Sequence, residues 1–386
     1  MSQPRDANRS AGLDYLRTAS ILIVIFNHFL ISFFFATSKI KFEGVIALIS
    51  ASAVLSIEWL FVLSGFLIGA MMIRSFERSD NWAACARDFW LRRWFRTVPA
   101  YYLFIFINYL LIKYQLTEGA FEYRSLFFSQ NLHEPEQTPH FFGESWSLAL
   151  DEWFYLTMPI MLGLLSFVFP LGGKKSFLIA SAVLIITPVL ARVAISDGFN
   201  FFQWDAAVRR ITIYHLDATG WGVLAAAVNK WFPTWWRSGI GQKLGGGLLL
   251  MLAGTCGSAY LVRIGANEEA LANVISIWSI TLMSSGTFFI IPWLSQSFKN
   301  TFNSNRLVET ISLYSYSIYL CHFPTIILVK YFFEINQFTS IIKLILIMIF
   351  CLAMVLLSAS FVFHLFEKPI SDLRERFTKK VNAAPF

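Results

Sequence analysis

Two ionisable residues, Arg17 and His28, lie inside the first long apolar stretch of the chain. They are eleven residues apart, and a helix with ~3.6 residues per turn would place them almost on one face, roughly 16 Å apart along its axis. Asp14 shares that face. Neutral histidine can accept a proton, whereas arginine cannot. The spacing therefore predicts a functional site, unless Arg17 only reaches the membrane surface and His28 only joins two helices.

A second apolar stretch carries an acid followed by two small residues. Glu58 lies in the string SIEWLFVLSGFLIG, ahead of Ser64 and Gly65. Acids inside a membrane are costly and mark functional sites by default, so Glu58 is a candidate partner for His28. Ser and Gly permit close backbone approach, which suits either a bound ligand or simple helix packing.

Two further strings combine polar groups with an apolar background. In ESWSLALDEWFYLTMP, Asp151 and Glu152 follow Trp146 closely, and a solvated helix start competes with a buried site for them. In LYSYSIYLCHFP, hydroxyl groups that include Tyr316 precede His322. Such hydroxyls often only tie helices together. The sequence predicts that these residues support the site at His28.

A basic cluster precedes the third apolar stretch. The segment ARDFWLRRWFRTVPAYY contains Arg93 and Arg96, three residues apart and hence neighbours on one helix face, and Pro99 is expected at the start of the span. Two guanidinium groups so placed can bind phosphates. Ordinary anchoring of a membrane helix by positive charge is the alternative.

The polar connection at residues 115–145 is the longest in the chain, and we expect it to act as a lid. Its string HEPEQTPH contains histidine and glutamate, but Pro135 and Pro139 break any helix there. This excludes the helical two-histidine arrangement of zinc enzymes, and we expect no metal site.

Composition indicates that membrane lipids surround these segments. Hydrophobic residues make up 56% of the 386 residues and charged residues 14%, which would leave a soluble fold covered in apolar surface. We expect an all-α, polytopic helical bundle of about ten spans. The expected spans are 13–36, 45–73, 97–114, 146–170, 176–196, 214–229, 244–262, 271–294, 311–333 and 340–366.

The distribution of positive charge predicts the orientation of the bundle. Lys and Arg concentrate in the alternate connections that share a side with the N-terminus, which favours cytoplasmic termini and argues against nucleic-acid binding. We expect residues 1–386 to form one domain, with cytoplasmic tails at 1–12 and 367–386 and no fused soluble domain. A multi-pass protein of the cell (inner) membrane follows from this reading.

Taken in order, these strings resemble the acyltransferase 3 family of membrane acyltransferases. The first similarity is an Arg, ten residues and a His. The others are an FFVLSGFLI-like string, an Arg-x-x-Arg element, a WSLxxEEQFY-like string, an SYSLYLxHFP-like string and a closing Glu-x-Pro. Here they correspond to Arg17 and His28, Leu60–Ile68, Arg93 and Arg96, Trp146–Tyr155, Ser315–Pro324, and Glu367 and Pro369. The departures are Glu58 for Asp, Asp151 for Glu, Trp153 for Gln and Cys321 for Trp.

The resemblance implies an O-acyltransferase, most simply an O-acetyltransferase, that uses acetyl-CoA or another acyl-CoA and holds no permanent cofactor. The acceptor would be a hydroxyl of a cell-surface glycan or a lipid-linked saccharide. His28 would be the general base or the acyl carrier, and the oligomeric state stays open, with a homo-oligomer allowed. The other expected catalytic residues are Glu152, Glu58 and Asp14; the donor-binding residues are Arg17, Arg93, Arg96, Ser64 and Gly65; the acceptor-side or supporting residues are Trp146, Asp151, Tyr316 and His322.

Two other functions remain open on the sequence. One is acylation of a small molecule such as an antibiotic. The other is a transporter or channel that uses the same buried charges, although the chain lacks the paired halves that many transporters show.

Overall fold

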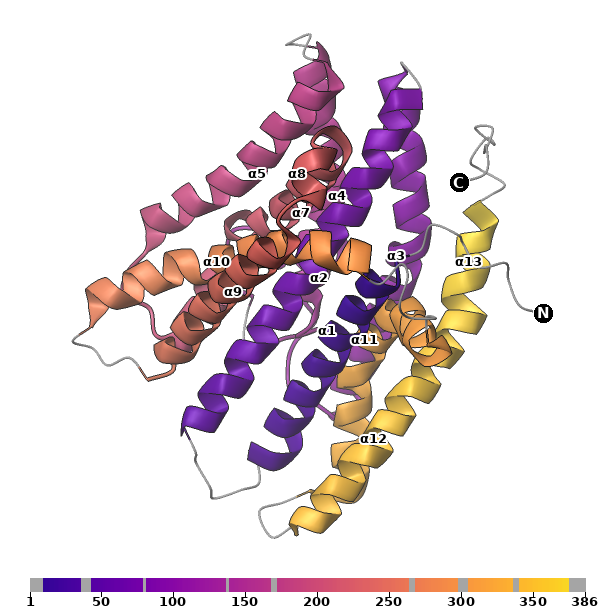
Figure 1. Cartoon of the computed structure of the whole chain (residues 1–386). Helices are drawn as coiled ribbons and strands as arrows, with labels where there is room; N and C mark the ends of the chain where they lie inside the picture. The colour runs from indigo at the N-terminus through magenta and orange to yellow at the C-terminus, as the bar shows by residue number, and fades with distance from the viewer. Residues whose placement is uncertain are drawn as a thin grey trace.

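The computed structural model describes residues 10–35, 43–78, 81–136, 139–167, 172–263, 268–297, 305–335 and 340–374, and their regular secondary structure is helical. No strand occurs among them (Figure 1). The predicted all-α class is therefore confirmed. Of the predicted tails, residues 1–9 and 375–386 lie outside the described residues.

Nine helices in the described part of the chain are long and apolar enough to cross a membrane, as expected of a polytopic bundle. They are α1 (Ala11–Phe29), α2 (Glu43–Arg78), α3 (Trp82–Lys113), α4 (Ser145–Phe167), α5 (Gly173–Ile195), α9 (Ile240–Leu261), α10 (Glu269–Ser297), α11 (Arg306–Phe333) and α12 (Ile341–Val362). Two of them continue into π-helical turns, α1 through Leu30–Phe35 and α12 through Phe363–Glu367.

The span expected at 214–229 is a shorter helix, α7 (Asp217–Trp231), of 15 residues. At 1.5 Å per residue it is roughly 22 Å long, less than the ~30 Å of a hydrocarbon core. Its first residue, Asp217, forms a buried ion pair with Arg192 of α5, with Nη2 and Oδ2 2.8 Å apart. Thr281 of α10 donates a hydrogen bond to the same carboxylate at 2.6 Å. Because these buried contacts satisfy the Asp217 carboxylate, α7 can begin in the interior of the protein.

The third membrane helix begins earlier than the expected residue 97. Asn81 caps α3 by accepting a hydrogen bond from the Ala84 backbone at 3.0 Å, and the amphipathic basic segment is the first half of the helix. The helix continues through Pro99. Arg93 and Arg96 are therefore part of a membrane helix and not of a connection before it.

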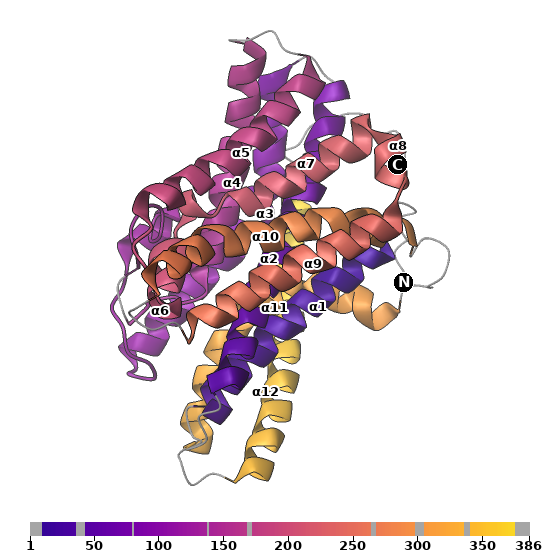
Figure 2. The same ribbon diagram turned by 60° about the vertical axis from the view of Figure 1, so that its left-hand side comes forward.

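The helices that matter for the site surround α1. Helix α1 packs between α2 and α11, α7 lies against α2 and α5, and α9 and α10 run side by side (Figures 1 and 2). Three further short α-helices occur in the described part of the chain: α6 (Phe201–Trp204), α8 (Pro233–Arg237) and α13 (Lys368–Leu373). This arrangement brings residues from both ends of the chain together around His28.

Candidate active site

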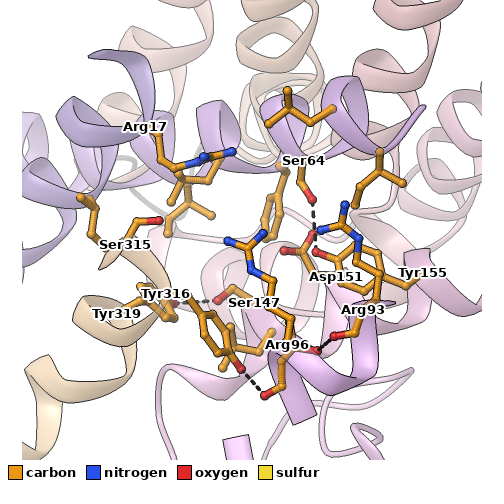
Figure 3. Close-up of a pocket in the computed structure, with 18 residues that line it drawn as sticks. Arg17, Ser64, Arg93, Arg96, Ser147, Asp151, Tyr155, Ser315, Tyr316 and Tyr319 are labelled. Atoms are coloured by element: carbon orange, nitrogen blue, oxygen red, sulfur yellow. Dashed lines mark hydrogen bonds between the residues drawn. The ribbon is translucent and has the colours of Figure 1, made fainter. Parts of the chain in front are cut away.

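A cavity of ≈ 290 Å³ lies among α1, α2, α3, α4 and α11, and we call it the arginine cavity. Arg17, Arg93 and Arg96 line it, and their side chains point toward the same space (Figure 3). The lining also includes Ile57, Ser64, Ser147, Asp151, Tyr155, Ser315, Tyr316 and Tyr319. The structure thus brings Arg17 together with Arg93 and Arg96, which lie far from it in the sequence.

Arg93 is poised to bind an anion. Its guanidinium carbon lies 5.7 Å from the centre of the Tyr155 ring, in a cation–π arrangement. Its Nε atom is buried and has no hydrogen-bond partner among the described residues. Arg96 lies one turn further along α3, with its Nε 4.0 Å from a carboxylate oxygen of Glu367. An anionic ligand in the cavity would supply the missing acceptor for Arg93.

Hydroxyl groups and one acid form the polar wall of the arginine cavity. The hydroxyl oxygens of Ser64 and Tyr155 lie 3.4 Å apart and face Asp151, whose Oδ1 has no partner in the described part of the chain (Figure 3). Tyr316 donates a hydrogen bond to the Thr97 carbonyl at 2.8 Å. Ser64, Asp151 and Tyr316 therefore lie at the arginine cavity. Asp151 and Tyr316, which were expected on the acceptor side, do not line the cavity that contains His28.

A second cavity, of ≈ 550 Å³, contains His28, and we call it the histidine cavity. His140, Arg209, Arg210, Lys330, Glu118 and Glu144 also line it. Asp205 holds the two arginines, at 2.5 Å from Arg209 and 2.7 Å from Arg210. Burial opposes ionisation of Asp205, but the two guanidinium groups lower its pKa below the usual value. The single carboxylate of Asp205 thus pairs with two guanidinium groups, so these three residues together carry a net positive charge.

His28 pairs with His322, and the contacts assign their tautomers. The Nδ1 of His28 lies 3.0 Å from the Nε2 of His322, and the rings stack with centroids 5.0 Å apart. The Nδ1 of His322 contacts the backbone carbonyl of Tyr319, which can only accept. His322 must donate there, so its Nε2 is an acceptor and the Nδ1 of His28 is the donor. In this neutral arrangement the Nε2 of His28 keeps its lone pair and is the basic atom.

The two cavities meet at Ile57 and Tyr319, which line both. The hydroxyl oxygen of Tyr319 lies 2.7 Å from that of Ser147. Both hydroxyls also lie 3.2 Å from the Glu144 carbonyl oxygen. This cluster lies where the two cavities meet, and we call Ile57, Tyr319 and Ser147 the partition.

The expected catalytic acids Glu58, Glu152 and Asp14 form hydrogen bonds with residues other than His28. Glu58 accepts from Ser284 at 2.5 Å and lies 2.6 Å from the Nε2 of His215. Glu152 accepts from Thr97 at 2.5 Å, and Asp14 accepts from Ser312 at 2.6 Å. None of the three lines either cavity in the described structure. The sequence made Glu58 a candidate partner for His28, but in the described structure the Nδ1 of His28 contacts His322 and the Glu58 carboxylate contacts His215.

Gly65 does not line the arginine cavity, whereas Trp146 lines the histidine cavity, on the side where an acceptor-side residue was expected. A Cβ at Gly65 would lie 2.2 Å from the Thr219 carbonyl oxygen, so this glycine permits α2 and α7 to pack closely and does not line the arginine cavity. Trp146 is buried at the edge of the histidine cavity, where the Arg209 guanidinium lies 4.5 Å from its ring centre. Close helix packing thus accounts for Gly65 without a donor contact.

Several residues of the site escaped the sequence reasoning. In the sequence, Arg209 and Arg210 belong to none of the strings that pointed to a site, and neither does His215, the partner of Glu58. Tyr319 lies within the LYSYSIYLCHFP string without being distinguished from its neighbours. Local sequence gives no sign of these contacts, since each joins helices far apart along the chain. In the described part of the chain, no group of three potential ligands could hold a metal ion.

Comparisons with known proteins place these features in context. A family model described as an acyltransferase domain matches residues 10–363. O-acetyltransferase OatA of Staphylococcus aureus (strain NCTC 8325 / PS 47) is 24% identical over 318 residues, covering 76% of this chain and 49% of the relative. A Bacillus subtilis (strain 168) protein provisionally named peptidoglycan O-acetyltransferase YrhL is 25% identical over 381 residues, covering 93% and 54%. The chain therefore spans about half the length of these curated relatives. No solved structure matches it.

Proposed function

This chain belongs to the acyltransferase 3 family, and on that premise we propose that it is a membrane O-acetyltransferase of cell-surface glycans or lipid-linked saccharides. The donor would be cytoplasmic acetyl-CoA or another acyl-CoA. The names of OatA and YrhL, which specify O-acetyl transfer and in one case peptidoglycan, support this choice of reaction and acceptor. The protein would reside in the cell (inner) membrane with its arginine cavity toward the cytoplasm.

The observation that carries the proposal is the pair of cavities stacked along α1. Arg17 lines the arginine cavity and His28, eleven residues later, lines the histidine cavity. Cationic side chains at one end suit the phosphates of an acyl-CoA, and a histidine at the other end suits proton transfer or acyl transfer. One route through the bundle would then join the donor to the acceptor.

Donor binding would use the groups that line the arginine cavity. Arg93 and Arg96 would bind phosphate oxygens, since guanidinium groups form short, charge-assisted hydrogen bonds with them. Arg17 would hold the pantetheine or phosphate end nearer to His28. The apolar side chains of α2 in the same cavity, including Leu60 and Ile68, would surround the pantetheine arm of the donor. The thioester would then reach the partition.

Two routes of transfer use the same basic atom of His28. In the first, the Nε2 of His28 accepts the proton of the acceptor hydroxyl as its oxygen attacks the thioester carbonyl, and this proton then goes to the departing thiolate of CoA. In the second, the Nε2 attacks the thioester and CoA leaves as the thiolate; the acceptor oxygen then displaces the imidazole, and the proton of the acceptor hydroxyl goes to the thiolate. His322 would hold the ring in position in both routes.

Labelled acetyl-CoA and a cell-wall glycan, incubated with purified protein, test the proposal. We expect label on the glycan, and loss of most transfer in His28→Ala, because general-base catalysis alone contributes about 10²–10⁴-fold. His364→Ala is the matched control, since this histidine contacts Tyr314 and lines neither cavity. Transfer by His28→Ala at the wild-type rate would overturn both routes. Solute flux without donor consumption would indicate a transporter.

A further inference from the structure

One buried acid of the histidine cavity has no role in the proposed reaction. Glu144 lies immediately before α4 and is 2% exposed, yet it lines the same cavity as His28. Its side-chain Oε1 is buried and has no hydrogen-bond partner among the described residues. A buried polar atom left without a partner destabilises a protein, because it has lost its hydrogen bonds to water. Such an atom at a cavity wall indicates a ligand that supplies the partner.

The main chain of Glu144 is held in place at the partition. Its carbonyl oxygen accepts hydrogen bonds from the hydroxyls of Ser147 and Tyr319, each at 3.2 Å. These contacts fix the start of α4 against α11 at the partition. They use the backbone carbonyl only, and Oε1 of the carboxyl group stays available to the cavity. The main chain at Glu144 is therefore fixed, while Oε1 of its side chain makes no hydrogen bond in the described structure.

The charge state of Glu144 limits what it can bind. Burial raises the pKa of Glu144 well above its usual value, and Glu136 acts in the same direction. A neutral carboxyl group both donates and accepts hydrogen bonds. Three cationic side chains, Arg209, Arg210 and Lys330, line the same cavity. They outnumber the carboxylates of Glu118, which also lines it, and of Asp205, which pairs with both arginines, and so disfavour a positively charged ligand. A hydroxyl group, which also donates and accepts, is a complementary partner.

We propose that the Glu144 carboxyl group hydrogen-bonds a hydroxyl of the saccharide acceptor, next to the hydroxyl that receives the acyl group. This inference rests on the proposed function. Glu144 would hold the sugar so that the reacting oxygen lies at the Nε2 of His28. It is an acceptor-binding residue in a cavity whose other assigned residue, His28, performs the transfer.

Steady-state transfer from acetyl-CoA to a soluble glycan fragment tests the assignment in purified full-chain protein. Glu144→Leu removes the hydrogen bond at similar volume, and we expect the KM for the glycan to rise at least about tenfold, as for a lost hydrogen bond of ~1.4 kcal/mol. Glu144→Gln keeps a neutral donor and acceptor, so its KM should stay within about threefold. The KM for acetyl-CoA should not change in either variant. Glu134→Leu, at an exposed loop glutamate, is the control.

The outcomes separate this assignment from the proposed function. Absence of glycan labelling by the wild-type protein would contradict the function itself. Wild-type activity together with an unchanged glycan KM in Glu144→Leu would overturn the assignment alone. Should Glu144→Leu fail to fold, Glu144→Asp keeps the carboxyl group but retracts it by one methylene. A raised glycan KM in Glu144→Asp, with a normal value in Glu144→Gln, would support the assignment, and equal values in both would contradict it.

Discussion

At the scale of single residues, the buried acids of this protein divide into those that hold the fold and those that face a cavity. Glu58, Glu152 and Asp14 each accept a hydrogen bond from a hydroxyl on another helix. Asp151 and Glu144 each keep an oxygen without a partner in the described structure, at a cavity wall. Burial of an acid is therefore not evidence of catalysis, whereas an unsatisfied acid at a cavity points to a ligand.

Replacement of Arg93 and Arg96 by Ala should weaken acetyl-CoA binding by at least about tenfold, because a hydrogen bond to a charged group contributes ~1.5–3 kcal/mol. Isothermal titration calorimetry of the purified double variant measures this. Arg92→Ala is the matched control on the same helix, since Arg92 pairs with Asp88 at 2.7 Å and does not line the arginine cavity. Unchanged affinity in the double variant would refute the donor site.

At the scale of elements, the close packing of α7 against α2 determines where α2 lies beside the two cavities. Gly65 of α2 and Gly222 of α7 face each other, and a Cβ at Gly222 would lie 2.2 Å from the Val62 carbonyl oxygen. Small residues at such a crossing let two backbones approach, which is the usual basis of tight helix contacts in membranes. The opposite side of α2 carries Ile57 and Ser64 into the cavities. The α2–α7 contact thus sets the position of one cavity wall.

Gly65→Ala should lower the stability of the folded protein by about 1–3 kcal/mol or more, because the added methyl group overlaps backbone atoms that cannot move independently. Thermal unfolding in detergent would report this as a lower midpoint. Gly245→Ala, in α9, has open space around its Cβ and should leave the midpoint unchanged or slightly raised. Equal midpoints for the two variants would show that the α2–α7 contact tolerates more separation than the structure indicates.

The sequence predicted elements better than it predicted contacts. Apolar runs located the long helices, because the ~30 Å membrane core imposes length and composition on each span. The same rule failed at α7, whose polar first turn is satisfied by Arg192 and not by solvent. His28 and Arg17 were found because ionisable residues stand out in an apolar helix. The pairing of His28 with His322, 294 residues away, depends on how α1 and α11 pack, and no local pattern encodes that.

At the scale of the whole molecule, both cavities are built from the same helices. Helix α1 contributes Arg17 to one and His28 to the other, and α11 contributes Tyr316 and Phe323 in the same way. The cavities therefore follow one another along the helix axes. A small movement of α11 relative to α4 would change the contact of Tyr319 with Ser147 and alter the opening between them.

The partition also affects whether the surrounding membrane can maintain a proton gradient. A passage that opens at both faces would let protons run down the gradient that energises the cell. Tyr319→Ala should therefore raise the proton leak of proteoliposomes, measured with a trapped pH-sensitive dye, whereas Phe323→Ala, which alters only the histidine cavity, should not. Equal leak in both would show that the seal lies elsewhere. The contact of one tyrosine with one serine would thus allow acyl groups to be exported across a membrane that stays electrically charged.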